Sequence, residues 1–100
     1  MDLPIACSLT EAELRKRRQA IMDSFQTMHV AVSELSDGYA FTFQASSEAL
    51  QRIAELVDLE RQCCPFLTFN IVVEAAQSAM RLEISGPKEA KKLIKEYFNI

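Results

Sequence analysis

Two adjacent cysteines, Cys63 and Cys64, are the residues of this 100-residue chain whose types and spacing best suit chemistry. Glu60 precedes them by three and four positions, the separations at which side chains adjoin on a helix surface. When the segment is projected as a helix, Glu60 lies within about 10° of the centre of the apolar arc, and both cysteines lie within about 70° of it. We therefore expect both thiols to face the interior, with a carboxylate beside them.

The position of Glu60 has two interpretations. Either the helix ends at the surface and the carboxylate reaches water, or Glu60 is a paired or functional carboxylate beside the two thiols. Arg61 can serve as its partner, extend along apolar surface or cap the last helical carbonyls. We take Glu60 and Arg61 as the candidate supporting residues of a thiol site.

A third cysteine, Cys7, can complete a set of three sulfur ligands. Pro65 ends the helix after Cys64, and unwinding there can bring the sulfurs of Cys63 and Cys64 toward one point. Thiolates select soft metals, and three sulfurs suit mercury(II) or arsenic(III), whereas tetrahedral zinc needs a further donor, which can be Glu60, His29 or another residue. The sequence thus predicts that Cys7, Cys63 and Cys64 bind a soft metal ion or metalloid, and it leaves open whether Cys7 reaches the pair.

Other interpretations of the cysteines compete with metal binding. Buried cysteines often only fill space in a core. An enzyme can use a cysteine as nucleophile or redox centre, assisted by Glu60, Arg61 or His29. However, the C-terminal end of a helix and a nearby carboxylate both disfavour a thiolate, and the sequence lacks a Cys-x-x-Cys motif, a glycine-rich phosphate loop and a Ser/His/Asp signature. We therefore assign no catalytic residue and favour a protein that is not an enzyme.

The cellular compartment decides which oxidation state these cysteines should have. The first residues show no basic region followed by an apolar run, which predicts a cytoplasmic protein without a signal peptide. Three cysteines are an odd count, and a reducing compartment favours free thiols over structural disulfides. A disulfide between Cys63 and Cys64 is expected least, because adjacent cysteines form a strained bridge.

Hydrophobic periodicity predicts the elements that position these residues. Apolar side chains recur at helical spacing in three segments and alternate with polar ones in four. The expected helices are residues 11–25, 48–64 and 88–98, and the expected strands are residues 28–33, 39–44, 67–74 and 80–84. The chain is therefore one α+β domain of residues 1–100 in the order α-β-β-α-β-β-α, with a four-stranded, mostly antiparallel sheet and helices packed on one face.

Local sequence signals predict the turns and helix caps that connect these elements. Asp37-Gly38 predicts a hairpin between the first two strands, and Ser46 or Ser47 can cap the second helix. The second strand should present an aromatic inner face, made of Tyr39, Phe41 and Phe43. The middle of the apolar stripe of the second helix is expected at four positions: Leu50, Ile53, Ala54 and Val57. Ala49, Leu56 and Leu59 are expected to widen the stripe on one flank.

Composition argues against two large classes of partner. The net charge of −3 disfavours nucleic acid, and no stretch approaches the roughly 20 apolar residues of a membrane span. With 49% hydrophobic and 25% charged residues, the chain is an ordinary globular domain. The alternative function is a binding or assembly module with structural cysteines, which holds a ligand or a partner, including a second copy in a homodimer, on the polar face of its sheet.

Residues 60–69, with the sequence Glu-Arg-Gln-Cys-Cys-Pro-Phe-Leu-Thr-Phe, resemble a signature of small bacterial proteins, most of them uncharacterised. The resemblance extends to residues 7–9, 37–41 and 82–87, and so covers most of the chain. Such proteins are associated with heavy-metal resistance contexts, mercury or arsenic. The resemblance implies that the paired cysteines and Cys7 should be tested together as a heavy-metal site, and it supplies no catalytic role for any residue.

Overall fold

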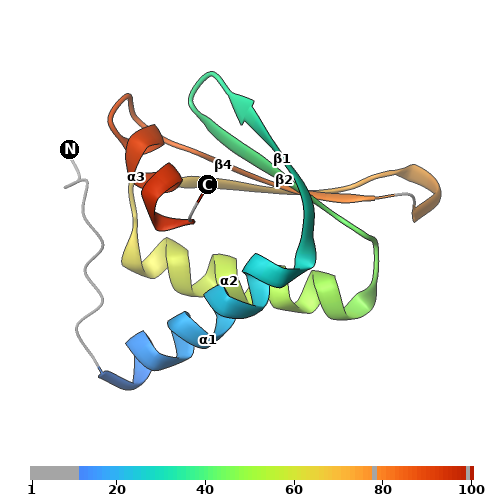
Figure 1. Cartoon of the computed structure of the whole chain (residues 1–100), viewed down its shortest axis with the longest axis horizontal. Coiled ribbons are helices and arrows are strands. Elements are labelled where there is room, and N and C mark those ends of the chain that lie inside the picture. The colour runs from blue at the N-terminus through green and yellow to red at the C-terminus, as the bar shows by residue number, and fades with distance from the viewer. Residues whose placement is uncertain (1–11, 78, 99) are drawn as a thin grey trace.

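The computed structural model describes residues 12–77, 79–98 and 100, and within them it confirms the α+β class and the order of elements (Figure 1). The elements are α1 (Ala12–Met28), β1 (His29–Leu35), β2 (Gly38–Phe43), α2 (Ser47–Cys63), β3 (Thr68–Val73), the short 3-10 helix η1 (Ala75–Gln77), β4 (Met80–Ser85) and α3 (Ala90–Tyr97). The first helix thus continues three residues beyond the expected end at residue 25, and the last begins two residues later than expected.

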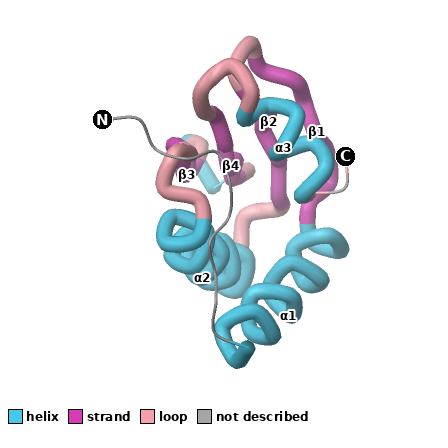
Figure 2. The backbone as a smooth tube through the Cα atoms, turned by 90° about the vertical axis from the view of Figure 1, so that its left-hand side faces the viewer, coloured by secondary structure: helices cyan, strands magenta, loops and turns pink. Residues whose placement is uncertain are grey.

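The four strands form one antiparallel sheet in the order β1-β2-β4-β3. Each hairpin joins neighbouring strands as predicted, and the two hairpins meet where β2 pairs with β4, with Phe41 opposite Leu82. This arrangement leaves β1 and β3 at the two edges of the sheet, and Figure 2 shows α2 running beneath β3. The sequence pattern did not decide this order.

The predicted aromatic face of β2 lies at the centre of the core. Phe41 and Phe43 are fully buried and Tyr39 nearly so. Phe25 of α1 and Phe98, the C-cap of α3, both pack against Phe41, and their ring centroids lie 5.0 and 5.5 Å from that of Phe41. These edge and tilted ring contacts tie two helices to the same side of the sheet. The expectation that helices cover only this side stays a prediction.

Gly38 shows why the predicted hairpin between β1 and β2 needs a glycine. The hairpin is confirmed, since Leu35 pairs with Gly38 across a two-residue connection. Gly38 does not adopt a positive φ angle, so the turn itself does not require it. A Cβ atom at this position would lie 1.8 Å from the carbonyl oxygen of Ile84. Glycine is therefore required by the close approach of β4.

The two ends of α2 follow the sequence signals. Ser46 is the N-cap, and its Oγ accepts a hydrogen bond of 3.0 Å from the backbone N–H of Ala49. At the other end the backbone N–H of Cys64 still donates to the Glu60 carbonyl at 2.6 Å, but Cys64 has left helical geometry, with φ −124° and ψ 74°. Pro65 follows and prevents a further turn, because it disfavours helical backbone in the residue before it.

The apolar stripe of α2 lies to one side of its predicted position. Ile53 is buried as expected, but Leu50 is 39% exposed and Ala54 is exposed as well. The expectation that Ala49, Leu56 and Leu59 widen the stripe on one flank is confirmed, and the helix buries this flank: Ala49, Ile53, Leu56, Leu59, Glu60 and Cys63. The expectation for Leu50 and Ala54 is wrong because the apolar arc of α2 is wider than the surface that α1 and the sheet cover.

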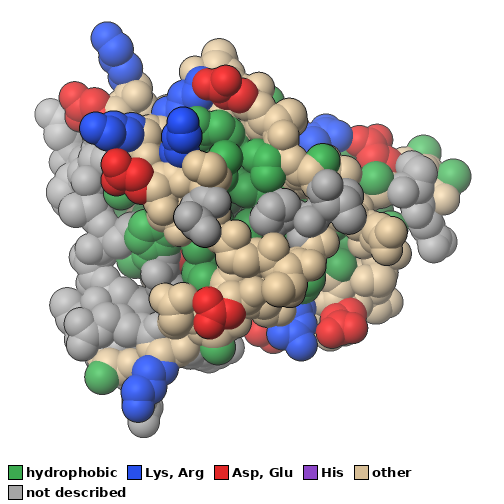
Figure 3. Space-filling view, viewed as in Figure 1, with side chains coloured by type: hydrophobic (Ala, Val, Ile, Leu, Met, Phe, Trp, Pro, Cys, Tyr) green, Lys and Arg blue, Asp and Glu red, His purple; other side chains and the backbone are tan. Residues whose placement is uncertain are grey.

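The helices can be checked for a membrane span, and one face of the surface shows how charged and hydrophobic side chains are distributed. None of the three helices in the described part combines the length and apolarity that crossing a membrane requires. On the face shown in Figure 3, basic side chains gather over α3 and are interspersed with acidic ones. Hydrophobic side chains reach the surface of this face at its right-hand end, where β3 and β4 are joined.

Candidate metal centre

Three side chains that can bind a metal converge at the C-terminal end of α2. One carboxylate oxygen of Glu60 and the Sγ atoms of Cys63 and Cys64 all lie within 4.8 Å of one another. All three residues are buried, with at most 1% of their surface exposed. The predictions that both cysteines face inward and that Glu60 adjoins them are therefore confirmed. The interpretation in which Glu60 reaches water is wrong, because the end of α2 is covered.

An apolar shell encloses this group. Cys63 and Cys64 belong to a small buried cluster with Phe66 and Ala90, separate from the main core. Ala90 opens α3, so this helix covers the end of α2. A narrow apolar hollow beside Cys64 has walls from the segment after α2 and from α3, namely Leu67, Leu93, Ile94, Tyr97 and Phe98. Such surroundings exclude water and strengthen electrostatic interactions within the group.

Each sulfur has one oxygen neighbour within this shell. The Sγ atom of Cys64 lies 3.7 Å from Oε2 of Glu60, and the Sγ atom of Cys63 lies 3.8 Å from the hydroxyl oxygen of Tyr97. Tyr97 was not predicted as a neighbour of the cysteines. The helical spacing of Leu93, Ile94 and Tyr97 is typical of one core-facing side, but no local signal connects residue 97 with residue 63.

The two cysteines differ in oxidation state. Cys64 is disulfide-bonded, whereas Cys63 is a free thiol. The expectation of free thiols throughout is therefore wrong for Cys64, because a count of cysteines does not reveal which sulfurs folding brings together. The expectation that Cys63 and Cys64 do not bridge each other is confirmed. Cys64 can act as a thiolate ligand or a hydrogen-bond donor only after reduction, since a disulfide sulfur carries neither a proton nor a negative charge.

The remaining predicted residues lie apart from this group or outside the described part. Arg61 pairs with Asp58, with 2.7 Å between Nη2 and Oδ1, and both side chains are more than half exposed. Its guanidinium is thus held at the surface next to a different carboxylate. Cys7 lies outside the described residues, and so does the side chain of His29.

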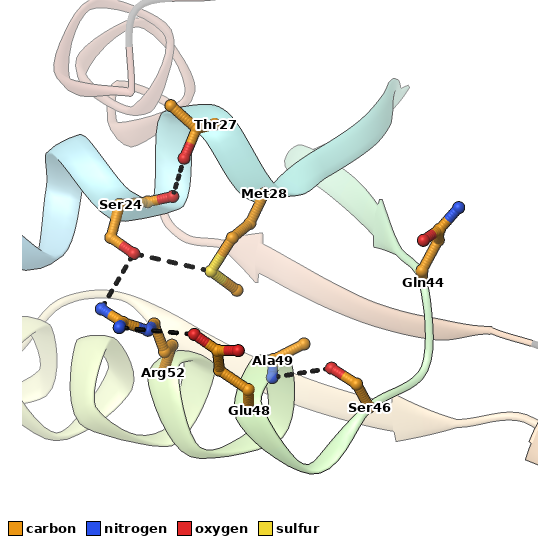
Figure 4. A pocket seen from close by; sticks show the side chains of 8 residues that line it. All are labelled: Ser24, Thr27, Met28, Gln44, Ser46, Glu48, Ala49 and Arg52. Carbon is orange, nitrogen blue, oxygen red and sulfur yellow. Dashed lines mark hydrogen bonds and ion pairs between the residues drawn. The ribbon is translucent and has the colours of Figure 1, made fainter.

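A second hollow, of about 300 Å³, lies near the opposite end of α2 (Figure 4). Its walls come from the end of α1, the segment after β2 and the start of α2: Ser24, Thr27, Met28, Gln44, Ser46, Glu48, Ala49 and Arg52. Arg52 donates from Nη1 to the hydroxyl of Ser24 at 3.1 Å, and its Nη2 lies 3.5 Å from Oε1 of Glu48. This hollow is open and its charges are already paired, so it is a weaker candidate than the cysteine group.

Comparisons of the chain with protein-family models, with curated proteins and with solved structures found no match. The resemblance to bacterial proteins from mercury and arsenic resistance contexts therefore stays a prediction. Function has to be argued from the geometry of the group formed by Glu60, Cys63 and Cys64.

Proposed function

We propose that this protein binds a soft metal ion or metalloid, mercury(II) or arsenic(III), through the vicinal cysteines Cys63 and Cys64 once Cys64 is reduced. The observation that supports this proposal best is the convergence of two sulfurs and one carboxylate oxygen within 4.8 Å in a buried, apolar setting. Buried cysteines that only fill space need no carboxylate beside them, whereas a metal site combines sulfur, nitrogen and carboxylate donors.

The distances suit a shared ion after small adjustments. Metal bonds of about 2.0–2.3 Å to oxygen and sulfur place tetrahedral ligand atoms roughly 3.5–4 Å apart. The separation of 3.7 Å between Cys64 Sγ and Glu60 Oε2 lies in that range. Thiolates favour soft ions, and Cys7 is the candidate for a third sulfur ligand, which mercury(II) and arsenic(III) prefer over a carboxylate. Zinc would use the Glu60 oxygen and a fourth ligand.

The test is an anaerobic titration of the fully reduced protein with mercury(II) and with arsenite, followed through ultraviolet absorption from thiolate to metal. We expect saturation at one metal per chain and loss of this saturation in the double variant Cys63→Ser, Cys64→Ser. The variant Cys7→Ser then distinguishes two sulfur ligands from three. The oxidised protein should not saturate until a reductant is added, because Cys64 is then unavailable.

Glu48→Ala is the matched control, since it removes a carboxylate from the other end of the same helix. Circular dichroism of every variant checks that the fold persists. Binding that is unchanged in the double cysteine variant would refute the proposal, and so would the absence of any defined saturation in the reduced protein.

The alternative function is a binding or assembly module that uses the polar face of the sheet, including a homodimer formed through that face. On this face Arg81 bridges two carboxylates, with 2.7 Å to Glu74 and 2.8 Å to Glu83, and Asn70 donates to Glu83 at 3.4 Å. These polar groups already satisfy one another, which disfavours a charged ligand. A charge-reversing variant Arg81→Glu that abolishes self-association, with metal binding absent throughout, would favour this alternative.

A further inference from the structure

The two edges of the sheet differ in how they are protected. β1 has a register shift between His29 and Ala31, and it carries Glu34, whose exposed carboxylate pairs with Lys91. A bulge and a charge are devices by which natural proteins prevent edge strands from pairing with other chains. β3 has neither: Thr68–Val73 pairs with β4 in continuous register and contains no charged residue and no proline.

Apolar side chains continue along the unprotected edge. The register places Ile71 opposite Leu82 and Val73 opposite Met80, and both β4 partners are buried. Ile71 and Val73 therefore share the core-facing side of the sheet, yet they are 38% and 56% exposed.

Leu50 of α2 adds to this surface. It is 39% exposed, and it lines a hollow together with Val73 and Met80. The hollow lies between the start of α2 and the end of β3, and α2 runs beneath β3 (Figure 2). The hydrophobic layer between α2 and the sheet thus extends past β3, and no element in the described part of the chain covers it there.

We propose that a second copy of this chain covers this edge, by antiparallel pairing of β3 with β3 of that copy about a two-fold axis. The result is a continuous eight-stranded sheet, and this contact is distinct from a dimer through the polar sheet face. If the axis passes beside Ile71, this residue faces its own copy, Phe69 faces Val73 on the same side, and Asn70 faces Val72 on the other. Because β3 contains no charged residue, this pairing of the two strands brings no like charges together.

Self-complementarity is the reason for choosing a second copy over an unrelated strand. Any antiparallel strand edge matches itself about a two-fold axis, and closed two-fold dimers are the commonest protein oligomers. A six-residue strand is about 20 Å long. Together with the exposed flank of α2 it provides a small interface, which predicts a dimer that dissociates on dilution.

The experiment is sedimentation velocity of the reduced, metal-free protein over a wide range of concentration, comparing wild type with Ile71→Lys and Val32→Lys. Val32 is the matched control: it is 37% exposed and lies opposite Phe41 on the core-facing side of the other edge strand. We expect a dimer for wild type and for Val32→Lys. We expect the dissociation constant of Ile71→Lys to rise by at least about 100-fold, because a two-fold dimer contains the change twice.

Two further measurements keep this result interpretable. Circular dichroism verifies that each variant folds, and Val73→Lys, at the more exposed of the two apolar positions, replaces Ile71→Lys if the latter does not fold. Amide hydrogen exchange of wild type should show protection of β3 that increases with protein concentration. A wild type that is monomeric at every concentration overturns the proposal. A dimer that both lysine variants disrupt, that neither disrupts, or that only Val32→Lys disrupts overturns it as well.

Discussion

The two ends of α2 each carry a glutamate, and the two carboxylates lie in opposite environments. Glu48, in the first turn, is 77% exposed and lies 3.5 Å from Arg52, which in turn donates to Ser24. Glu60, in the last turn, has no exposed surface and lies beside the sulfurs of Cys63 and Cys64. The start of α2 borders an uncovered edge of the sheet, whereas its end is covered by α3.

This difference shows where the chemistry of the molecule is concentrated. At the open end, water and neighbouring charges stabilise the carboxylate, so its ion pair contributes little to stability. At the closed end, a carboxylate and two sulfurs share an apolar shell, in which electrostatic interactions are stronger than in water. Substitutions at the two ends should therefore differ in both the size and the type of their effect.

The largest loss of stability should come from a substitution on the covered flank of α2, compared with one on its open flank. Ile53 is fully buried, so Ile53→Ala should lower the free energy of unfolding by about 2–5 kcal/mol through lost burial and a cavity. Leu50→Ala, three residues earlier, should cost less than about 1 kcal/mol in dilute protein, because Leu50 is already partly hydrated. Urea unfolding measures both values. Equal losses would show that the open flank is covered in solution.

Metal affinity should separate the two carboxylates themselves. Glu60→Ala should weaken zinc binding by the reduced protein about 10- to 100-fold, because zinc uses the oxygen ligand, and should weaken mercury(II) binding less. Glu48→Ala should leave both affinities unchanged. Competition titrations with a chromophoric chelator measure these constants. If both metals bind equally well with and without Glu60, the carboxylate is not a ligand, and the site consists of sulfurs alone.

How much of this site the sequence predicts depends on whether residues share one rigid element. Glu60 and Cys63 lie in the last turn of α2 and Cys64 follows directly, so a helical projection of these five residues already predicts that they adjoin and face inward. The contact between Cys63 and Tyr97 spans 34 residues and depends on how α3 packs over α2. No local pattern contains that information, and the disulfide bonding of Cys64 was missed for the same reason.

The fold shows the same division between local and distant information. The hairpins, the Ser46 cap and the aromatic face of β2 follow from alternation and turn residues close together in the chain. The strand order depends on which hairpin edges meet, and the exposure of Leu50 depends on where the sheet ends. Gly38 is instructive, because the hairpin prediction was right although the glycine is needed for contact with Ile84.

A smaller effect is expected at the cap of the open end. Ser46→Ala removes the acceptor of the hydrogen bond from the Ala49 N–H and should lower the free energy of unfolding by about 1 kcal/mol. Ser47→Ala is the matched control, because Ser47 is the exposed first residue of the helix and should matter less than half as much. Chemical denaturation of the two variants measures both losses of unfolding free energy. Identical losses would mean that the cap does not stabilise the helix in solution.

The smallest loss of stability should come from removing the ion pair between Glu34 of β1 and Lys91 of α3. This pair contacts water, as does the pair at the open end of α2. The Lys91 Nζ lies 2.6 Å from Oε1 of Glu34, and this hydrogen bond, with the charge of Lys91, holds the pKa of the Glu34 carboxyl below its ordinary value. A carboxyl whose pKa is lower in the folded state stabilises the fold above the unfolded-state pKa, and this stabilisation is lost as the pH falls through the folded-state pKa.

Thermal unfolding of wild type and Glu34→Gln should therefore differ slightly at neutral pH and coincide in acid. Added salt should reduce the difference at neutral pH, because both side chains contact water. A difference that is insensitive to salt and persists in acid would show that Glu34 acts through packing instead of charge.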